Sequence, residues 1–385
     1  MPVLAPIAAW RHYAALDSSR LTAMAVAEFP VASTARAQAG AVLPRAVRQA
    51  RLYFLVLFVL GLAALIFGVE GRFPGGLFLY PPPVDWIPPL GRDPWLAAFA
   101  LHQQDPVFAA CGGAQSLEEF QTLYWWEWLR RASALLLAVA AVAGLAGASA
   151  AARFRFAAPR LLGLCAIVLV YAAARGLVGL AAAHVEELAR FNVGQYRHAV
   201  DLTFASAAVA AVLASVLVPP LPERPAGARP FHPGAWLWAG AILLDIGFGA
   251  LFMARDAAAV WTAWPGLGDV PPARFLSYAP LWLNFVFNPY TIQLAHRSLS
   301  VGLWIAALGS MIWSIRRNPA GQRGAVALFG LLTAEMAIGI AALVLGVPPA
   351  LSILHRVGGV LVLAVAFTLV PWSASPSRLR SPAIP

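Results

Sequence analysis

The sequence has little charge and almost no cysteine. Only 11% of its 385 residues are charged, whereas 61% are hydrophobic. Soluble globular domains carry about 25% charged residues, so this composition excludes an ordinary soluble protein and predicts a polytopic membrane protein. Cys111 and Cys165 are the only two cysteines, one in a loop and one inside an apolar segment. So placed, they predict neither a disulfide framework nor a cysteine-based metal cluster.

Lysine is absent from the sequence. All 27 basic residues are therefore arginine, and the formal net charge is +10. In membrane proteins such a surplus of positive charge gathers in the cytoplasmic loops. The charge therefore bears on orientation in the membrane, and no nucleic-acid partner is expected.

Eight segments are apolar over the roughly 20 residues that a membrane-spanning helix needs. They are 52–70, 131–149, 161–183, 200–218, 236–254, 295–314, 324–346 and 352–371. Arginines occur in the short loops after the second, fourth and sixth segments and in both tails. These loops fall on one side of the membrane, which predicts that both termini are cytoplasmic. The fold class expected is an all-α integral membrane protein.

The eight segments divide into two similar sets of four. Each set contains a long connection rich in Trp and Pro, at about 71–130 and 255–294. Aligning the helices that follow these connections pairs Arg130 with His296, Arg131 with Arg297, Arg175 with Glu335 and Asp201 with His355. An even number of spans per set gives both sets the same orientation. We therefore expect two tandem, pseudo-symmetric four-helix bundles with their polar residues turned inward.

The expected organisation has five parts. Residues 1–47 are rich in Ala, Pro and Arg, have no apolar core long enough for a cleaved signal peptide, and are expected to form a disordered cytoplasmic tail. The first four-helix half then covers 48–220, a cytoplasmic linker 221–235 and the second half 236–372. A cytoplasmic tail is expected at 373–385.

A histidine followed by an arginine occurs near the start of two apolar helices. His296 and Arg297 lie at the start of the sixth segment, about one turn inside the expected helix, and His355 and Arg356 lie at the corresponding position of the eighth. Both segments are expected to run inward from the outer side, so the two imidazoles should lie at similar depth. Haem iron accepts two axial imidazoles, and neighbouring arginines can meet the anionic propionates. The alternative is two helix-end histidines bonded to loop carbonyls or water.

The first half has ions at the corresponding positions. Arg130 and Asp201 replace the two histidines, and neither is a normal ligand of haem iron. We expect either a salt bridge between them or pairing of Asp201 with Arg175. Glu127, one turn before Arg130, is either a general base or radical-stabilising carboxylate near a cofactor, or an acid paired with Arg130 or Arg131.

Two further acids lie in the middle of predicted spans of the second half. Asp245 and Glu335 are either protonated or bonded to groups around the haem. The sequence alone assigns neither of them a chemical role.

Five motifs occur in the following order along the chain: WIPPL at 86–90, SLEEFQTLYWWEW at 116–128, GALFMARDAAAVWTAWP at 249–265, IQLAHR at 292–297 and ILHRVGGVLVL at 353–363. With eight spans, they resemble the haem A synthase family over most of residues 50–372. Members of that family oxidise the C8 methyl of haem O to the formyl group of haem A for cytochrome oxidase.

The resemblance implies a histidine pair in each half. His296 and His355 would bind a haem B that passes electrons, and Glu127 would be the catalytic glutamate beside haem O. The first-half histidines of the family fall at Arg130 and Asp201 in this sequence. The family's segment after the first span is also altered, to GRFPGG.

Three functions follow from these observations. The first is a haem A synthase-like oxidoreductase in a bacterial inner membrane, and the second is a non-catalytic haem B protein of the same fold, serving electron transfer or oxidase assembly. The third is a structural subunit without cofactor. The partners expected are membrane lipid, haem O synthase or cytochrome oxidase assembly factors, and further copies of the chain.

Overall fold

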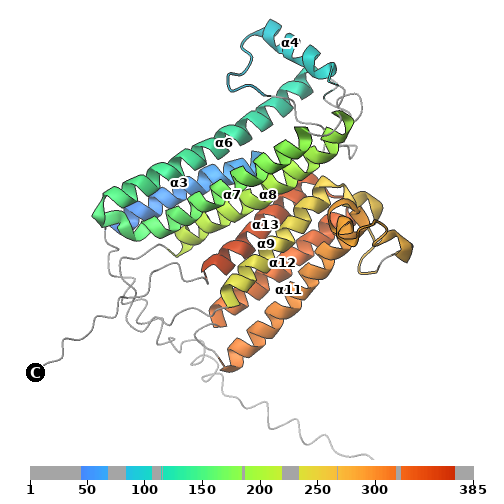
Figure 1. The fold of residues 1–385 in the computed structure, drawn as a ribbon. Coiled ribbons are helices and arrows are strands. Elements are labelled where there is room, and N and C mark those ends of the chain that lie inside the picture. The colour runs from blue at the N-terminus through green and yellow to red at the C-terminus, as the bar shows by residue number, and fades with distance from the viewer. Residues whose placement is uncertain are drawn as a thin grey trace, which may run out of the picture. The chain divides into compact units, whose positions relative to one another are not determined.

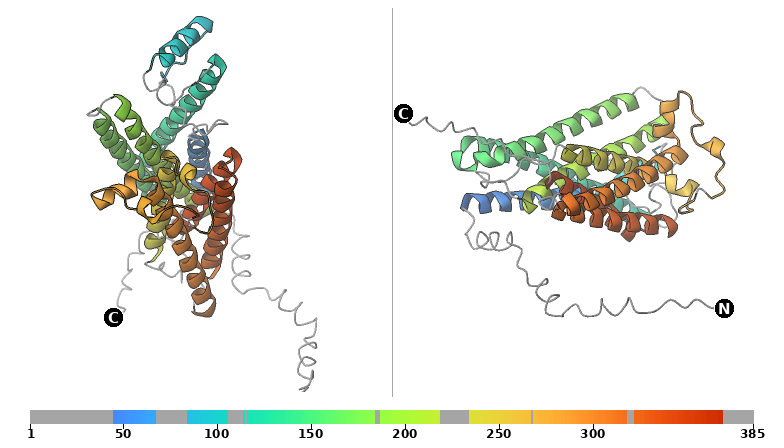
Figure 2. Two further views of the ribbon diagram at one scale, coloured as in Figure 1. Left: turned by 90° about the vertical axis from the view of Figure 1, so that its right-hand side faces the viewer. Right: turned by 90° about the horizontal axis from the view of Figure 1, so that it is seen from below.

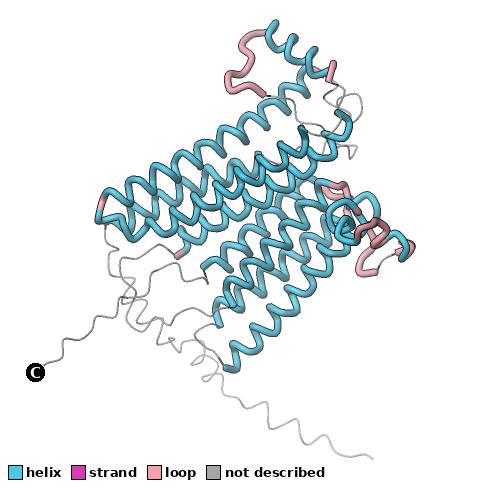
Figure 3. The backbone as a smooth tube through the Cα atoms, in the orientation of Figure 1, coloured by secondary structure: helices cyan, strands magenta, loops and turns pink. Residues whose placement is uncertain are grey.

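The computed structural model describes residues 45–67, 84–105, 114, 116–183, 187–218, 234–266, 268–317 and 322–368. The chain divides into two units, Met1–Arg48 and Gln49–Pro385, and the helical fold belongs to the second unit. Nearly all of the predicted N-terminal tail, most of the predicted linker, the C-terminal tail, Cys111 and GRFPGG lie outside the described residues. Within the described residues the regular structure is helical, without a strand (Figure 3).

Eight helices in the described part of the chain are long and apolar enough to cross a membrane, which confirms the predicted all-α membrane class. They are α3 (Arg45–Phe67), α6 (Leu117–Ala150), α7 (Ala158–Ala183), α8 (Glu187–Leu217), α9 (Gly234–Ala254), α11 (Pro289–Arg317), α12 (Gln322–Val344) and α13 (Pro349–Thr368). We call α3, α6, α7 and α8 the first half, and α9, α11, α12 and α13 the second half.

Helix α6 begins well before the apolar run that predicts it. The side chain of Ser116 accepts a hydrogen bond from the backbone N–H of Glu119 at 3.1 Å. Ser116 with Glu119 has the spacing of a capping box, and Glu118 and Glu119 complement the helix dipole in the first turn. The helix therefore starts at Leu117, not at 131. As a result, Glu127 and Arg130, which precede the predicted span, lie well inside α6.

Helix α8 is the member of the first half that also packs against the second half (Figures 1 and 2). Ala208 and Val212 pack with α3, α6 and α7. Val209, Ala210 and Leu213, on the other side of α8, enter the apolar cluster of α9, α11, α12 and α13. The span of α8 is 50% buried, against 17–33% for the other seven spans. Its many alanines allow this close approach on two faces. Because the second core includes α8, the division into two pseudo-symmetric bundles stays a prediction.

The long connection of the first half contains the short helix α4 (Arg92–Gln103), which packs on α6 near its start (Figure 1). Trp95 and His102 of α4 lie against Phe120, at ring centroid distances of 6.1 and 5.2 Å. Burial lowers the pKa of the His102 imidazole, which favours the neutral form in this aromatic cluster. Helix α4 is too short to span a membrane, as expected for this Trp- and Pro-rich connection.

The corresponding connection of the second half is built from short helical turns. They are η2 (Ala257–Val260), η3 (Pro272–Arg274), η4 (Leu281–Leu283) and α10 (Asn284–Phe287). Asn284 and Asn288 are almost fully buried and bond to carbonyls of this segment, Asn284 to Tyr278 at 2.7 Å and Asn288 to Arg274 at 2.9 Å. The connection is therefore tied to the residue at which α11 begins.

Candidate functional site

Asn288 and Pro289 set the start of the helix that carries His296. The side-chain oxygen of Asn288 accepts from the backbone N–H groups of Tyr290 at 3.0 Å and Thr291 at 3.4 Å. Pro289 is the first residue of α11, a position at which a missing N–H costs nothing. His296 is thus about two turns inside the helix, deeper than the single turn expected from the apolar run.

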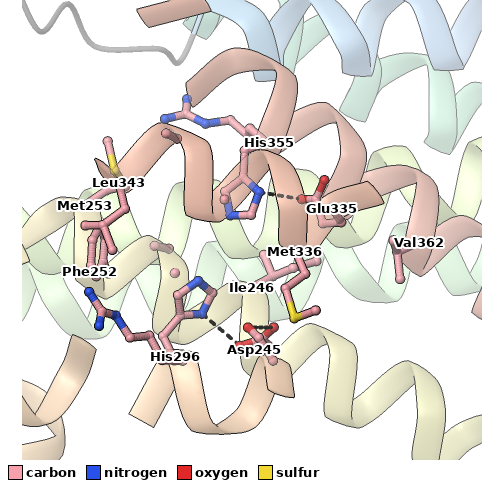
Figure 4. Close-up of a pocket in the computed structure, with 18 of the residues that line it drawn as sticks. Asp245, Ile246, Phe252, Met253, His296, Glu335, Met336, Leu343, His355 and Val362 are labelled. Atoms are coloured by element: carbon pink, nitrogen blue, oxygen red, sulfur yellow. Dashed lines mark hydrogen bonds and ion pairs between the residues drawn. The ribbon is translucent and has the colours of Figure 1, made fainter. Parts of the chain in front are cut away.

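The structure brings His296 and His355 together. His355 is the seventh residue of α13 and His296 the eighth of α11, so the two side chains leave their helices at similar depth. The ring centroids are 6.4 Å apart and the ring planes are inclined at 69°. One nitrogen of each ring points into the space between the rings (Figure 4). Two nitrogen–metal bonds of about 2 Å each fit in this space.

The other nitrogen of His296 is bonded to an acid. Its Nδ1 lies 2.8 Å from Oδ1 of Asp245 on α9. The second oxygen of Asp245 accepts a hydrogen bond from the hydroxyl of Ser300 at 2.8 Å. A carboxylate acceptor favours the tautomer with the proton on Nδ1, in which the lone pair of Nε2 is available on the side of His355.

His355 has an acid in the equivalent place. Its Nδ1 lies 3.0 Å from Oε1 of Glu335 on α12, an ion-pair distance, although the two groups are not aligned as a hydrogen bond. Glu335 packs against α13, where its carboxylate would lie 1.9 Å from a Cβ at Gly358. Glycine at this position therefore makes room for the acid beside the histidine.

A cavity of about 190 Å³ opens between the four helices of the second half and α8. Its walls are mostly apolar and include Ile242, Ile246, Phe252, Leu303, Leu332 and Val362. The cavity is also lined by two histidines and the arginines that follow them, His296, Arg297, His355 and Arg356. A mainly apolar space with a few converging polar groups is typical of a cofactor site.

Arg297 is held at the edge of this cavity by the loop before α11. Its guanidinium stacks on the ring of Trp261 at 3.8 Å, and Nη1 donates to the carbonyl of Ala263 at 2.8 Å. Among the described residues, its Nε is buried and has no hydrogen-bond partner. A buried donor without a partner is costly, so this nitrogen is suited to an anionic group inside the cavity.

These residues fit a haem. The described residues contain no group of three or more His, Cys, Asp or Glu placed to hold a bare metal ion. Two imidazoles alone suit a metal that brings its other ligands with it, as the iron of a porphyrin does. The apolar walls suit the porphyrin faces, and the arginines suit its propionates.

The first half holds its polar residues in a closed network of ions. Both oxygens of Glu127 accept from Arg130, each at 2.7 Å, and Oε1 also accepts from Nε of Arg131 at 2.5 Å. The side chain of Glu127 is only 6% exposed. This is the arrangement of an acid paired with arginines, one of the two alternatives that the sequence left open.

Asp201 on α8 completes this network. Its Oδ1 lies 3.0 Å from Nε of Arg175 and accepts from the hydroxyl of Tyr171 at 3.0 Å. Its Oδ2 lies 3.5 Å from Nη1 of Arg130. Both salt bridges considered for Asp201 are therefore present, the longer with Arg130 and the shorter with Arg175. The structure brings Arg130 and Asp201 together, but as an ion pair that offers iron no lone pair of an imidazole.

Sequence reasoning missed what Asp245 and Glu335 do. An acid in the middle of a span marks a functional site by default, and that signal was present for both residues. It did not identify the partners, because Asp245 and His296 lie on helices whose contact cannot be read from spacing alone. Ser300 and Tyr171, which bond to Asp245 and Asp201, were also missed.

Comparison with known proteins identifies the family of the chain. Residues 81–367 match the model of the family described as cytochrome oxidase assembly protein. The chain is 31% identical over 366 residues to the haem A synthase of Chelativorans sp. (strain BNC1), covering 91% of this chain and 97% of that protein. The chain belongs to the haem A synthase family.

A second relative in the family gives the same picture. The haem A synthase of Brucella anthropi is 31% identical over 339 residues, which cover 85% of this chain and 92% of that protein. No solved structure matches the chain. Family membership and the eight apolar helices together establish a multi-pass membrane protein.

Proposed function

We propose that the chain is a haem A synthase-like membrane oxidoreductase, which oxidises the C8 methyl of haem O to the formyl group of haem A for cytochrome oxidase. The observation that carries the proposal is the pair of imidazoles, His296 and His355, facing each other across a cavity in a chain of this family. Haem B is the cofactor proposed for this cavity, and when bound it supplies electron transfer.

In this proposal the second half binds and shields the cofactor. His296 and His355 would be the residues that hold the iron. The Nε of Arg297 and the guanidinium of Arg356 would be the donors available to the propionates. The apolar walls exclude water, which strengthens these charged contacts.

Glu127 is the proposed catalytic residue, by its position in the family pattern. Arg130 and Arg131 hold its carboxylate in one orientation through three hydrogen bonds. Arg130 and Asp201 do not fit iron ligation, so the substrate haem is proposed to contact the first half without axial imidazoles.

One pair of measurements tests the proposal. A pyridine haemochrome spectrum of the purified protein should show haem B, and its absence would contradict the haem site. Expression in cells that make haem O but lack haem A should then produce haem A.

The alternative is a non-catalytic haem B protein of the same fold. It rests on the lack of imidazoles at Arg130 and Asp201, and the relatives, which are haem A synthases, do not favour it. Retained haem B without any haem A in the expression test would establish that alternative and overturn the catalytic proposal. A variant with Glu127→Gln is the matched control, because it should keep haem B in the second half and lose haem A formation.

We propose a bacterial inner membrane location with both termini cytoplasmic, supported by the arginines in alternate short loops. The partners proposed are membrane lipid, haem O synthase or oxidase assembly factors, and further copies of this chain. Reporter fusions active only in the cytoplasm should be active at both termini, and activity at one terminus alone would contradict this topology.

A further inference from the structure

The two histidines contact the same local pattern on two different helices. Helix α9 carries Asp245 and Gly249, and α12 carries Glu335 and Gly339. In each case an acid is followed four residues later by a glycine. Residues four apart lie on one face of a helix. Each helix therefore presents a carboxylate and, one turn further on, a surface without a side chain.

Each imidazole lies on both parts of this pattern. Nδ1 of His296 is 2.8 Å from Asp245, and a Cβ at Gly249 would lie 3.2 Å from Cε1 of the same ring. For His355 the contact is closer, because a Cβ at Gly339 would lie 2.7 Å from its Cε1 and 3.2 Å from its Nε2. A side chain at Gly339 would force the ring to move.

We propose that Asp245 with Gly249, and Glu335 with Gly339, are positioning elements that fix the rotation and the protonated nitrogen of the two haem-ligating imidazoles. The inference rests on the haem site of the proposed function. The acid lies beside Nδ1, at hydrogen-bond distance for His296 and at ion-pair distance for His355. The glycine leaves room for the ring against the neighbouring helix, so that Nε2 would be directed at the iron. A carboxylate on Nδ1 also raises the basicity of the ligand nitrogen.

The first half contains the glycine of this pattern, but with an arginine in place of the acid and without an imidazole. Arg175 and Gly179 on α7 occupy the positions aligned with Glu335 and Gly339. Among the described residues, no atom outside the local backbone comes within 4 Å of a Cβ placed at Gly179. The shorter Asp201 reaches Arg175 without covering this glycine. Gly179 is therefore a matched control for Gly339 within the same protein.

The first experiment compares alanine at the three glycines in the full-length protein, purified in detergent with its haem. Gly339→Ala should cause the largest loss of bound haem, Gly249→Ala a smaller loss, and Gly179→Ala none. Alanine is the better helix former, so a loss cannot be attributed to a weakened helix. Equal haem content in all three variants would contradict the role of the glycines.

The second experiment measures the reduction potential and the absorption spectrum of the bound haem. Asp245→Leu and Glu335→Leu should raise the potential, because the ligand nitrogens lose basicity, and should weaken haem binding by about 10–100-fold. Asp245→Asn and Glu335→Gln keep an acceptor oxygen and should restore both properties in part. Ser300→Ala removes a contact of Asp245 that does not involve the imidazole, and it should shift the potential least.

The outcomes separate this inference from the proposed function. Haem bound by the wild type, with an unchanged potential and spectrum in both leucine variants, would overturn the positioning role and leave the haem site intact. Wild-type protein without haem would overturn the haem site and the inference with it. A raised potential in the leucine variants, restored in the amide variants, would support it.

Discussion

The two halves place interacting polar residues at the same positions and use them in opposite ways. In the second half, Glu335 on α12 lies 3.0 Å from His355 on α13. In the first half, Arg175 on α7 lies 3.0 Å from Asp201 on α8. In the second half the acid lies on α12 and the base on α13, whereas in the first half the base lies on α7 and the acid on α8. The scaffold therefore determines where a partner lies, whereas the side chains determine whether a metal ligand is left available.

The difference has an energetic consequence. In the first half the ions of α6, α7 and α8 satisfy one another, and removing one partner from such a buried group costs about 3–5 kcal/mol. In the second half each carboxylate engages one nitrogen of a ring and leaves the other available. The first half is thus stabilised by its own residues, and the second half is completed by a ligand.

The largest effect is expected from removing an axial ligand. His296→Ala or His355→Ala should cause the largest loss of bound haem, because the iron would be held by one imidazole instead of two. The pyridine haemochrome spectrum of the purified variants measures this loss. Tyr171→Phe in the first half is the control and should keep wild-type haem content. Haem retained at the wild-type level in both alanine variants would refute the predicted ligand pair.

The second prediction converts the first half into a copy of the second. Arg130→His with Asp201→His restores two imidazoles, and Arg175→Glu supplies the acid that faces the new ring at position 201. Haem per chain should rise by one in this triple variant, as measured by haemochrome and protein content. Adding Gly179→Ala should reverse the gain. An unchanged haem content in a folded triple variant would show that the two halves differ in more than these side chains.

The third prediction concerns the ion network alone. Asp201→Leu leaves Arg175 without the carboxylate that it contacts and should lower the free energy of unfolding by about 3 kcal/mol. Denaturation in detergent, followed by helical circular dichroism, measures the change. The double variant Asp201→Leu with Arg175→Leu should recover part of the loss, since no charge remains unpaired at that contact. Additive effects of the two single changes would indicate that the pair contributes nothing.

The smallest effect is expected at Tyr171. Its hydroxyl donates one hydrogen bond to Asp201 at 3.0 Å. Tyr171→Phe should cost about 1 kcal/mol in the same denaturation assay, with haem content unchanged. A cost as large as that of Asp201→Leu would mean that the hydroxyl, and not the arginine, is the main partner of the acid.

Much of the fold could be predicted because it depends on composition. Long apolar runs determine the eight spans, and the structure confirms them. The starts of α6 and α11 were misplaced because they depend on local bonds, the cap of Ser116 and that of Asn288, which lie outside the apolar runs. Apolar periodicity carries no information on such bonds.

The site was predictable only as far as repetition allowed. The repeated His-Arg pair indicated that His296 and His355 form one site, and in the structure their ring centroids are 6.4 Å apart. The partners of their Nδ1 atoms depend on which helices are neighbours and on their rotation, neither of which follows from one sequence. The sequence shows a glycine four residues after Asp245 and another four residues after Glu335. Their significance is visible only in the structure, where they contact the histidines.

Two consecutive residues of helix α8 belong to different sites, one to the ion network of the first half and the other to the cavity of the second half. Asp201 belongs to the ion network of the first half, while Leu202 and, one turn on, Ser206 line the cavity of the second. A one-residue insertion before Asp201 would turn this register by about 100° and misplace both sets of contacts together. Length changes in α8 should therefore be far less tolerated than in the loops on either side of it.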